Sequence, residues 1–199
     1  MRSYWHRLPA LLAAVAIPVL VLAGCSEKTS GNASGTGGST AAPTSGSTTR
    51  STSTKPSVSR PKVIDFKGAD PCGLLTDAQK QTFGLTRTPQ TLKSSGHKDA
   101  TACSISSGDF SYGISVVATP NEGIELYAGR PTTSPVQIAG FPALLDKPQG
   151  MGNVCFLGVD VADGQLLDLQ VDSSKIPVDE LCTRAVAIGE AMIQTIASR

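Results

Sequence analysis

Residues 62–199 are predicted to form an α+β domain: an antiparallel sheet of about five to six strands, packed against a C-terminal helix and a short N-terminal helix. Three observations predict this fold. Apolar and polar residues alternate in several short runs, an apolar stripe with helical spacing follows Pro177, and a helix-capping pattern begins at Thr76. Period-two alternation is typical of half-buried strands, and a 3.6-residue period is typical of a helix lying on a core.

The short N-terminal helix is predicted from the segment Thr76-Asp77-Ala78-Gln79. In a capping box the first hydroxyl accepts from the third helical N–H, and the Gln side chain reaches back to the cap. The helix is expected to run to about Phe83 and to end at Gly84, because glycine adopts the left-handed conformation that terminates helices.

Strands are expected over 101–107 and 110–118, with a short helical turn between Asn121 and Tyr127. The segment 136–145 also has strand composition but contains Pro142. Proline cannot donate to a sheet ladder, so this single strand is placed at an edge or a bulge.

A β-hairpin over 154–171 is the clearest local prediction. A two-residue Asp163-Gly164 turn would set Val159 against Asp168, an apolar residue against a charged one. A three-residue loop, Ala162 to Gly164, instead pairs Val159 with Leu167. We therefore expect the second register, with Gly164 in the left-handed conformation of a bulged turn.

The C-terminal helix is expected to start near Pro177, because proline suits the first helical position. Its buried stripe consists of Leu181, Ala185, Ile188 and Met192. Cys182 lies on the same side, within reach of Cys155 on the inner face of the hairpin.

Residues 1–24 read as an export signal, with basic Arg2 and Arg7 followed by an uncharged run of about 16 residues that is short for a membrane span. The run ends in Leu22-Ala23-Gly24-Cys25, which resembles the lipobox of bacterial lipoproteins. That resemblance implies cleavage before Cys25, a diacylglyceryl group on its sulfur, and a location at the extracytoplasmic face of the cell membrane.

Residues 25–61 are predicted to be a disordered tether. Of the 35 residues from Ser26 to Arg60, 25 are Ser, Thr, Gly or Pro. Such a composition cannot bury enough apolar surface to offset the entropy of ordering. A flexible coil of this length spans roughly 30–35 Å, and sugar on its Ser/Thr-rich stretches is an open alternative to an unmodified spacer.

Four cysteines remain after Cys25, and an even number in an exported chain predicts two disulfides with three possible connectivities. We expect the bridges to join neighbours in sequence, Cys72 with Cys103 and Cys155 with Cys182. Each would close a loop of about 30 residues and contribute about 3.5 kcal/mol in the chain-entropy model.

The cysteine order, together with Asp70-Pro71-Cys72-Gly73-Leu74-Leu75-Thr76 and Gly140-Phe141-Pro142-Ala143, resembles domain-of-unknown-function family 3558, a group of actinobacterial lipoproteins. The resemblance covers about residues 64–197 plus the lipobox. Ile105 departs from it, because many members carry an aromatic residue two positions after the second domain cysteine. The family implies a lipid-anchored α+β envelope protein and transfers no catalytic residues.

No catalytic constellation is found in the sequence. His97, the only histidine after residue 6, is interpreted as a solvated loop side chain, and Glu122 and Glu125 as a solvated helix face. The hairpin aspartates (Asp160, Asp163, Asp168) lack the ligand spacing of an EF-hand, so no metal or other cofactor is expected. Tyr112, Tyr127 and Arg130 are interpreted as core and rim packing rather than as a binding surface.

Composition leaves three functions open: a tethered binding module, a structural or accessory subunit of an envelope complex, and an envelope hydrolase. Residues 62–199 carry 11 basic and 15 acidic side chains, a net charge of −4. This balance excludes a basic stripe for nucleic acid, and the scarcity of Trp and Tyr argues against a glycan-stacking face. A binding module that takes a protein or an apolar small molecule is therefore favoured.

Overall fold

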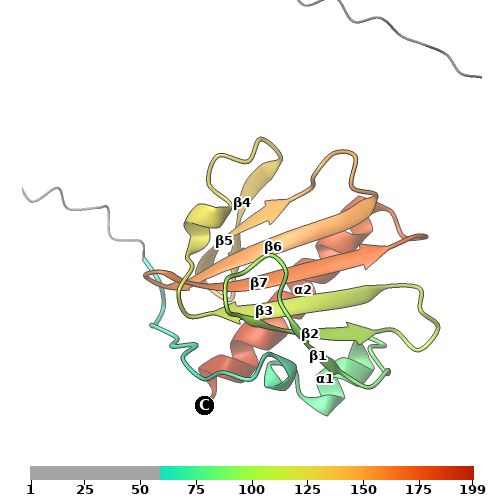
Figure 1. Cartoon of the computed structure of the whole chain (residues 1–199), viewed down its shortest axis with the longest axis horizontal. Helices are drawn as coiled ribbons and strands as arrows, with labels where there is room; N and C mark the ends of the chain where they lie inside the picture. The colour runs from blue at the N-terminus through green and yellow to red at the C-terminus, as the bar shows by residue number, and fades with distance from the viewer. Residues whose placement is uncertain (1–58) are drawn as a thin grey trace, which may run out of the picture. The chain divides into compact units, whose positions relative to one another are not determined.

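A computed structural model describes residues 59–199. The predicted signal peptide, Cys25 and nearly all of the tether lie outside the described residues. The domain is α+β, with a seven-stranded antiparallel sheet in the order β1-β2-β3-β7-β6-β5-β4 (Figure 1). Its elements in chain order are η1 (Pro71–Gly73), α1 (Asp77–Thr82), β1 (Gln90–Lys93), β2 (Thr101–Ser106), β3 (Gly113–Thr119), η2 (Ile124–Leu126), β4 (Thr133–Ile138), β5 (Phe141–Asp146), β6 (Asn153–Ala162), β7 (Gln165–Ser173) and α2 (Val178–Ala197).

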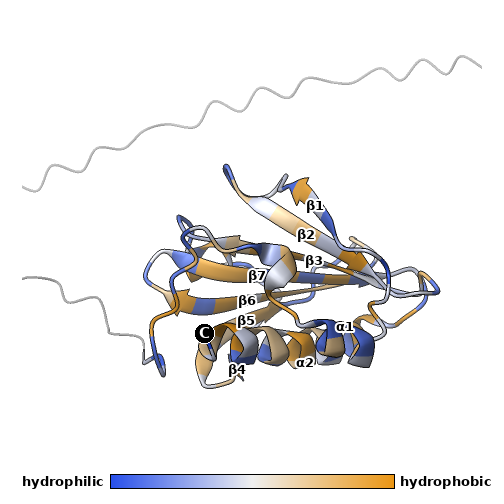
Figure 2. Ribbon diagram, turned by 90° about the horizontal axis from the view of Figure 1, so that it is seen from below, coloured by the Kyte–Doolittle hydropathy of each residue, from blue (hydrophilic) through white to orange (hydrophobic). Residues whose placement is uncertain are grey.

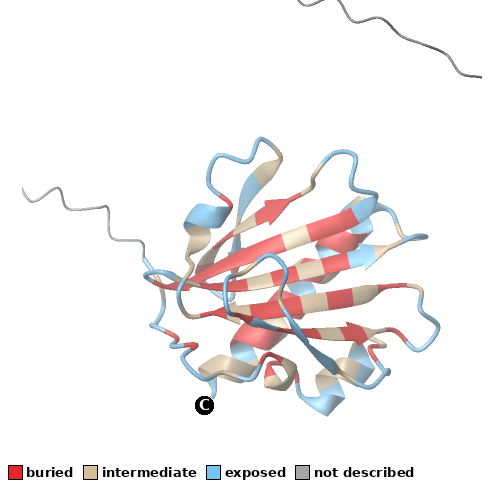
Figure 3. Cartoon of the chain, viewed as in Figure 1, coloured by how far each residue is buried: buried red, intermediate tan, exposed pale blue. Residues whose placement is uncertain are grey.

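Both helices lie on one side of the sheet, which leaves the opposite side without a helical layer (Figure 2). Alternate residues of the central strands point toward α2 and form the main core, among them Leu157, Leu169 and Val116. In Figure 3 the buried residues concentrate in these strands and along the inner side of α2. No helix of residues 59–199 is long and apolar enough to span a bilayer.

The predicted capping box and both predicted disulfides are present. The Thr76 hydroxyl accepts from the backbone N–H of Gln79, and the Gln79 side chain accepts from the N–H of Thr76. Cys72 is bonded to Cys103, and Cys155 to Cys182. The second bridge ties the central strand β6 to the start of α2.

The predicted hairpin register is confirmed, since Val159 pairs with Leu167 and Leu157 with Leu169. The predicted three-residue loop is wrong in detail. Ala162 pairs with Gln165, so the turn holds only Asp163 and Gly164, and the odd residue is absorbed as an irregularity in β6 between Asp160 and Ala162. Gly164 has a φ of 69°, the left-handed conformation expected of it.

The sheet has one hairpin more than the sequence indicated. The segment predicted as one strand over 136–145 is folded at Ala139-Gly140, whose φ angles of 49° and 85° make a tight turn, so that it contributes to both β4 and β5. Pro142 lies in β5 but outside its pairing with β6, and Pro135 lies in the edge strand β4. The other edge, β1, is a short exposed strand that was not predicted.

The N-terminal segment 60–64, which we call the N-terminal strap, lies across the turn that joins β6 and β7. Arg60, which the sequence places in the tether, donates to the buried Asp160 at 2.8 Å and to Asp163 at 3.0 Å. Farther along, the N–H of Ile64 donates to the carbonyl of Val161. The chain therefore enters the domain at the β6–β7 turn.

Candidate functional site

The side of the sheet opposite α2 is called the open face. Because side chains alternate along strands, the residues between the core positions point to it, including Ser104, Val117, Asp168 and Gly158. One half is covered by two connections, 94–100 between β1 and β2 and 120–132 between β3 and β4. The other half, where β2 and β7 end and where β3 and β6 begin, is bare.

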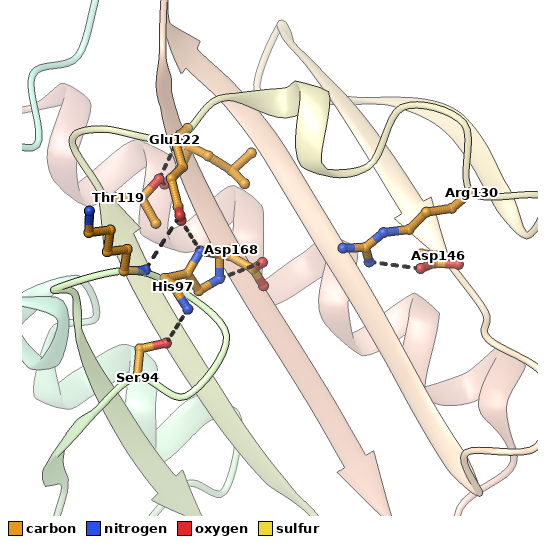
Figure 4. A network of polar contacts seen from close by, with 9 residues as sticks. Ser94, His97, Thr119, Glu122, Arg130, Asp146 and Asp168 are labelled. Atoms are coloured by element: carbon orange, nitrogen blue, oxygen red, sulfur yellow. Dashed lines mark hydrogen bonds and ion pairs between the residues drawn. The ribbon is translucent and has the colours of Figure 1, made fainter.

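The covered half contains a histidine held between two carboxylates, the histidine clamp (Figure 4). The Nδ1 atom of His97 lies 2.6 Å from Oε2 of Glu122, and its Nε2 atom lies 3.0 Å from Oδ2 of Asp168. The His97 side chain is only 9% exposed. The interpretation of His97 and Glu122 as solvated side chains is therefore wrong.

Local backbone structure explains how these residues meet. The N–H of His97 donates to the Ser94 hydroxyl, which curls the connection back over the sheet. The Thr119 hydroxyl lies 2.7 Å from the carbonyl of Glu122, which turns the chain sharply after β3. The His97 ring thus contacts Glu122, which is 25 positions away in sequence, and Asp168, which is 71 positions away. Patterns of local spacing cannot predict such contacts.

The electrostatics favour a charged imidazole. The hydrogen bond to Asp168 raises the pKa of His97, burial opposes it, and the bond to Glu122 raises it further. Both ring nitrogens face carboxylates, so neither is left to take a proton from a hydroxyl nucleophile, as the histidine of a hydrolase must. The clamp therefore links connection 94–100 to connection 120–132 and to β7.

Beside the clamp, polar side chains continue across β6 to β5. The Tyr127 ring packs on Gly158, and its buried hydroxyl has no hydrogen-bond partner among the described residues. Burial, followed by the nearby charge of Asp168, raises the pKa of Tyr127. Arg130 lies over this ring and pairs at 3.1 Å with the buried Asp146 (Figure 4).

The interpretation of Tyr127 as core packing is confirmed, since its exposed fraction is 0%. The hairpin aspartates do not converge on one point. Asp160 and Asp163 pair with Arg60, and Asp168 pairs with His97. Within residues 59–199 no group of three or more His, Cys, Asp or Glu side chains is placed to hold a metal ion.

The bare half of the open face carries three adjoining depressions, which we call the trough. Their volumes are about 510, 270 and 530 Å³. The first two share Ser106 and Phe110, and the last two share Asp172 and Ser173, so they form one path across β2, β3, β7 and β6. The lining consists mainly of hydroxyl and amide side chains: Thr86, Thr88, Gln90, Ser104, Ser106, Ser111, Asn153, Gln170, Ser173 and Ser174.

Two large apolar side chains line the trough: Phe110 lies where the first two depressions meet, and Met151 lines the third. Phe110 is 63% exposed and Met151 is 64% exposed. A charged residue accompanies each of them: the positive Arg87 lines the same depression as Phe110, and the negative Asp172 lines the same depression as Met151. No ion pair is formed by Arg87 or Asp172 among the described residues.

Phe110 is held in an uncommon backbone conformation. Its φ is 55°, the left-handed region that bulky residues avoid. Asp109 fixes the surrounding turn by accepting from the N–H of Ser111 and the hydroxyl of Ser107, bonds that lower the pKa of Asp109 to about 2. The Arg87 guanidinium lies 4.2 Å from the Phe110 ring centroid and supports the ring from one side. The strand expected over 110–118 included Phe110, whereas β3 begins only at Gly113 and Phe110 lies in the turn before it.

Fold and site together define an α+β domain. One face of its sheet packs on α2, and half of the opposite face is uncovered. A family model described as "Protein of unknown function (DUF3558)" matches residues 20–195, and the chain belongs to this family. No curated protein and no solved structure matches the chain.

Proposed function

We propose that this chain is a lipid-anchored envelope lipoprotein whose domain binds another envelope protein through the trough. The observation that carries the binding proposal is Phe110. Holding a bulky residue in the left-handed region costs about 1–2 kcal/mol, and an exposed ring gains little from burial in return. Strained residues of this kind cluster at ligand-binding sites.

The trough's chemistry points to a protein partner rather than to a lipid or a charged polymer. Its depressions are open and lined mostly by hydroxyl and amide groups, whereas small-molecule pockets are concave and mostly apolar. One positive and one negative charge, Arg87 and Asp172, cannot select a polyanion. The partner we infer presents an uncharged, extended segment with apolar side chains that contact Phe110 and Met151.

Addition of a strand at a sheet edge is a weaker alternative. Edge strands that recruit partners are long and flat, but β1 has only four residues and ends in Lys93. At the other edge, β4 contains Pro135. The bare face therefore offers the better surface.

The anchoring part of the proposal rests on the sequence. The family match begins at residue 20 and so includes Leu22-Ala23-Gly24-Cys25 as well as the tether. In this proposal two or more acyl chains at Cys25 give stable attachment. Arg60, at the described end of the tether, pairs with Asp160 and Asp163 beside the β6–β7 turn, and the trough lies at the opposite end of these strands.

Site-specific photo-crosslinking in intact cells tests the binding proposal. A photoreactive phenylalanine analogue is placed at Phe110, at Met151, or at the control position Val63, which is 71% exposed on the N-terminal strap. We expect one discrete adduct shared by positions 110 and 151 and absent at 63. Equal labelling at 63, or no adduct at 110 and 151, would refute the proposal. An adduct of twice the chain's mass would replace the inferred partner by a second copy.

A further inference from the structure

One side chain joins the two connections that cover the open face. His97 projects from connection 94–100, Glu122 belongs to connection 120–132, and Asp168 lies on β7 beneath them. The N–H of Lys98 adds one weak bond to Glu122, at 3.4 Å. The polar contact between the two connections thus depends on His97 and Glu122.

The clamp is complete in only one protonation state. A neutral imidazole has one N–H, whereas the imidazolium has two. Each ring nitrogen of His97 faces a carboxylate, so a neutral ring would leave one nitrogen lone pair against a carboxylate oxygen. The charged and titratable groups around the clamp are Glu122 from the β3–β4 connection, Asp168 from β7, the Tyr127 hydroxyl near Asp168, and Lys98, the next residue after His97.

The sign of the pH effect follows from this geometry. The folded-state pKa of His97 is raised. The stabilisation is therefore fully present below the ordinary histidine pKa of about 6.5 and is lost as the pH rises through the raised value.

Connection 94–100 covers apolar surface. Ala102 and Val117 pair in the same row of the sheet as Asp168. With Ala100, which ends the connection, they form a small cluster whose members are at most 8% exposed. Because α2 lies on the other side of the sheet, this burial depends on the connection staying in place.

We propose that the Glu122–His97–Asp168 clamp is a proton-controlled latch. With His97 charged, the latch holds connection 94–100 closed on the open face. When His97 loses its proton, the connection is released and uncovers Ala102 and Val117 next to the trough. The latch is a property of the fold and does not depend on the partner inferred above.

The test combines NMR with hydrogen exchange on the full chain. The chain has two histidines, His6 and His97, and a His6→Gln variant assigns the ring signals. We expect His97 to titrate above the ordinary value. Amide protection of residues 94–100, corrected for the intrinsic pH dependence of exchange, should fall across the same titration. By linkage the fall is about tenfold for each pH unit that separates the raised pKa from the ordinary one.

Variants separate a latch from a merely structural contact. His97→Gln should give low protection of 94–100 at every pH, and Asp168→Asn should shift the loss of protection to lower pH. Lys98→Gln removes the adjacent side-chain charge but keeps the backbone N–H that bonds Glu122, and it should behave as the wild type. An ordinary or lowered His97 pKa would overturn the proposal. So would protection of 94–100 that is independent of pH in the wild type.

Discussion

At the scale of single residues, Phe110 is expected to contribute to binding but little to the stability of the fold. Its side chain buries little, and its backbone conformation favours Asn or Gly over Phe. Removing the ring forfeits the stacking of Arg87, worth about 0.5–1 kcal/mol at an exposed site. Relief of the left-handed strain offsets that loss.

Phe110→Asn is therefore expected to leave the free energy of unfolding unchanged or to raise it by up to about 1 kcal/mol. Urea denaturation of both proteins measures this. A loss of more than about 1 kcal/mol would show that Phe110 is a folding residue, which would remove the main support for the trough as a binding site.

Gly158 illustrates the opposite case, a residue fixed by packing. A Cβ atom there would lie 2.7 Å from the Tyr127 ring, and this ring is fully buried. Gly158→Ala should destabilise the domain by about 1–3 kcal/mol, the usual cost of overpacking. Gly96→Ala is the matched control, since nothing lies within 4 Å of its Cβ position. Equal unfolding midpoints for the two variants would contradict this packing.

At the scale of elements, patterns local in sequence predicted local structure well. The capping box of α1 and the register of the β6–β7 hairpin were readable because each depends on residues a few positions apart. The β4–β5 turn was missed because its first left-handed position is occupied by Ala139. Gly or Asn usually occupies such a position, and alanine gives no indication of a turn. Strand β1 was missed because its four residues are all exposed and carry no alternation.

The disulfide between Cys155 and Cys182 acts at this scale, because it fixes the start of α2 on β6. The sequence separation is 27 residues, so the double variant Cys155→Ala/Cys182→Ala should lower the free energy of unfolding by about 3.5 kcal/mol in the chain-entropy model. Calorimetry or denaturant titration measures the loss. A change below about 1 kcal/mol would mean that packing alone positions the helix.

The candidate site lay largely beyond sequence reasoning. The clamp joins residues 97, 122 and 168, and the trough joins residues near 87, 110, 151 and 172. These positions meet only through the order of strands in the sheet, which single-sequence patterns do not give. No recognised catalytic motif was found in the sequence, and the contacts of both His97 nitrogens with carboxylates could not be predicted from it.

At the scale of the whole molecule, the proposals describe a domain held at the membrane by its N-terminal end. The N-terminal strap enters at the β6–β7 turn, where Arg60 is held by Asp160 and Asp163. The trough lies at the other end of these strands. A domain with a net charge of −4 and a neutral hydroxyl-rich trough is expected to bind neither nucleic acid nor isolated glycan at micromolar concentration, which direct binding assays can check.

An envelope partner requires the chain to be in the envelope, so the mass of the processed N-terminus tests the central claim most directly. Mass spectrometry of the protein purified from membranes should show residues 1–24 removed and Cys25 carrying a diacylglyceryl group. Cys25→Ala should leave the chain unprocessed or released from the membrane. An N-terminus at Ser26, or a cleaved and unmodified Cys25, would contradict the account.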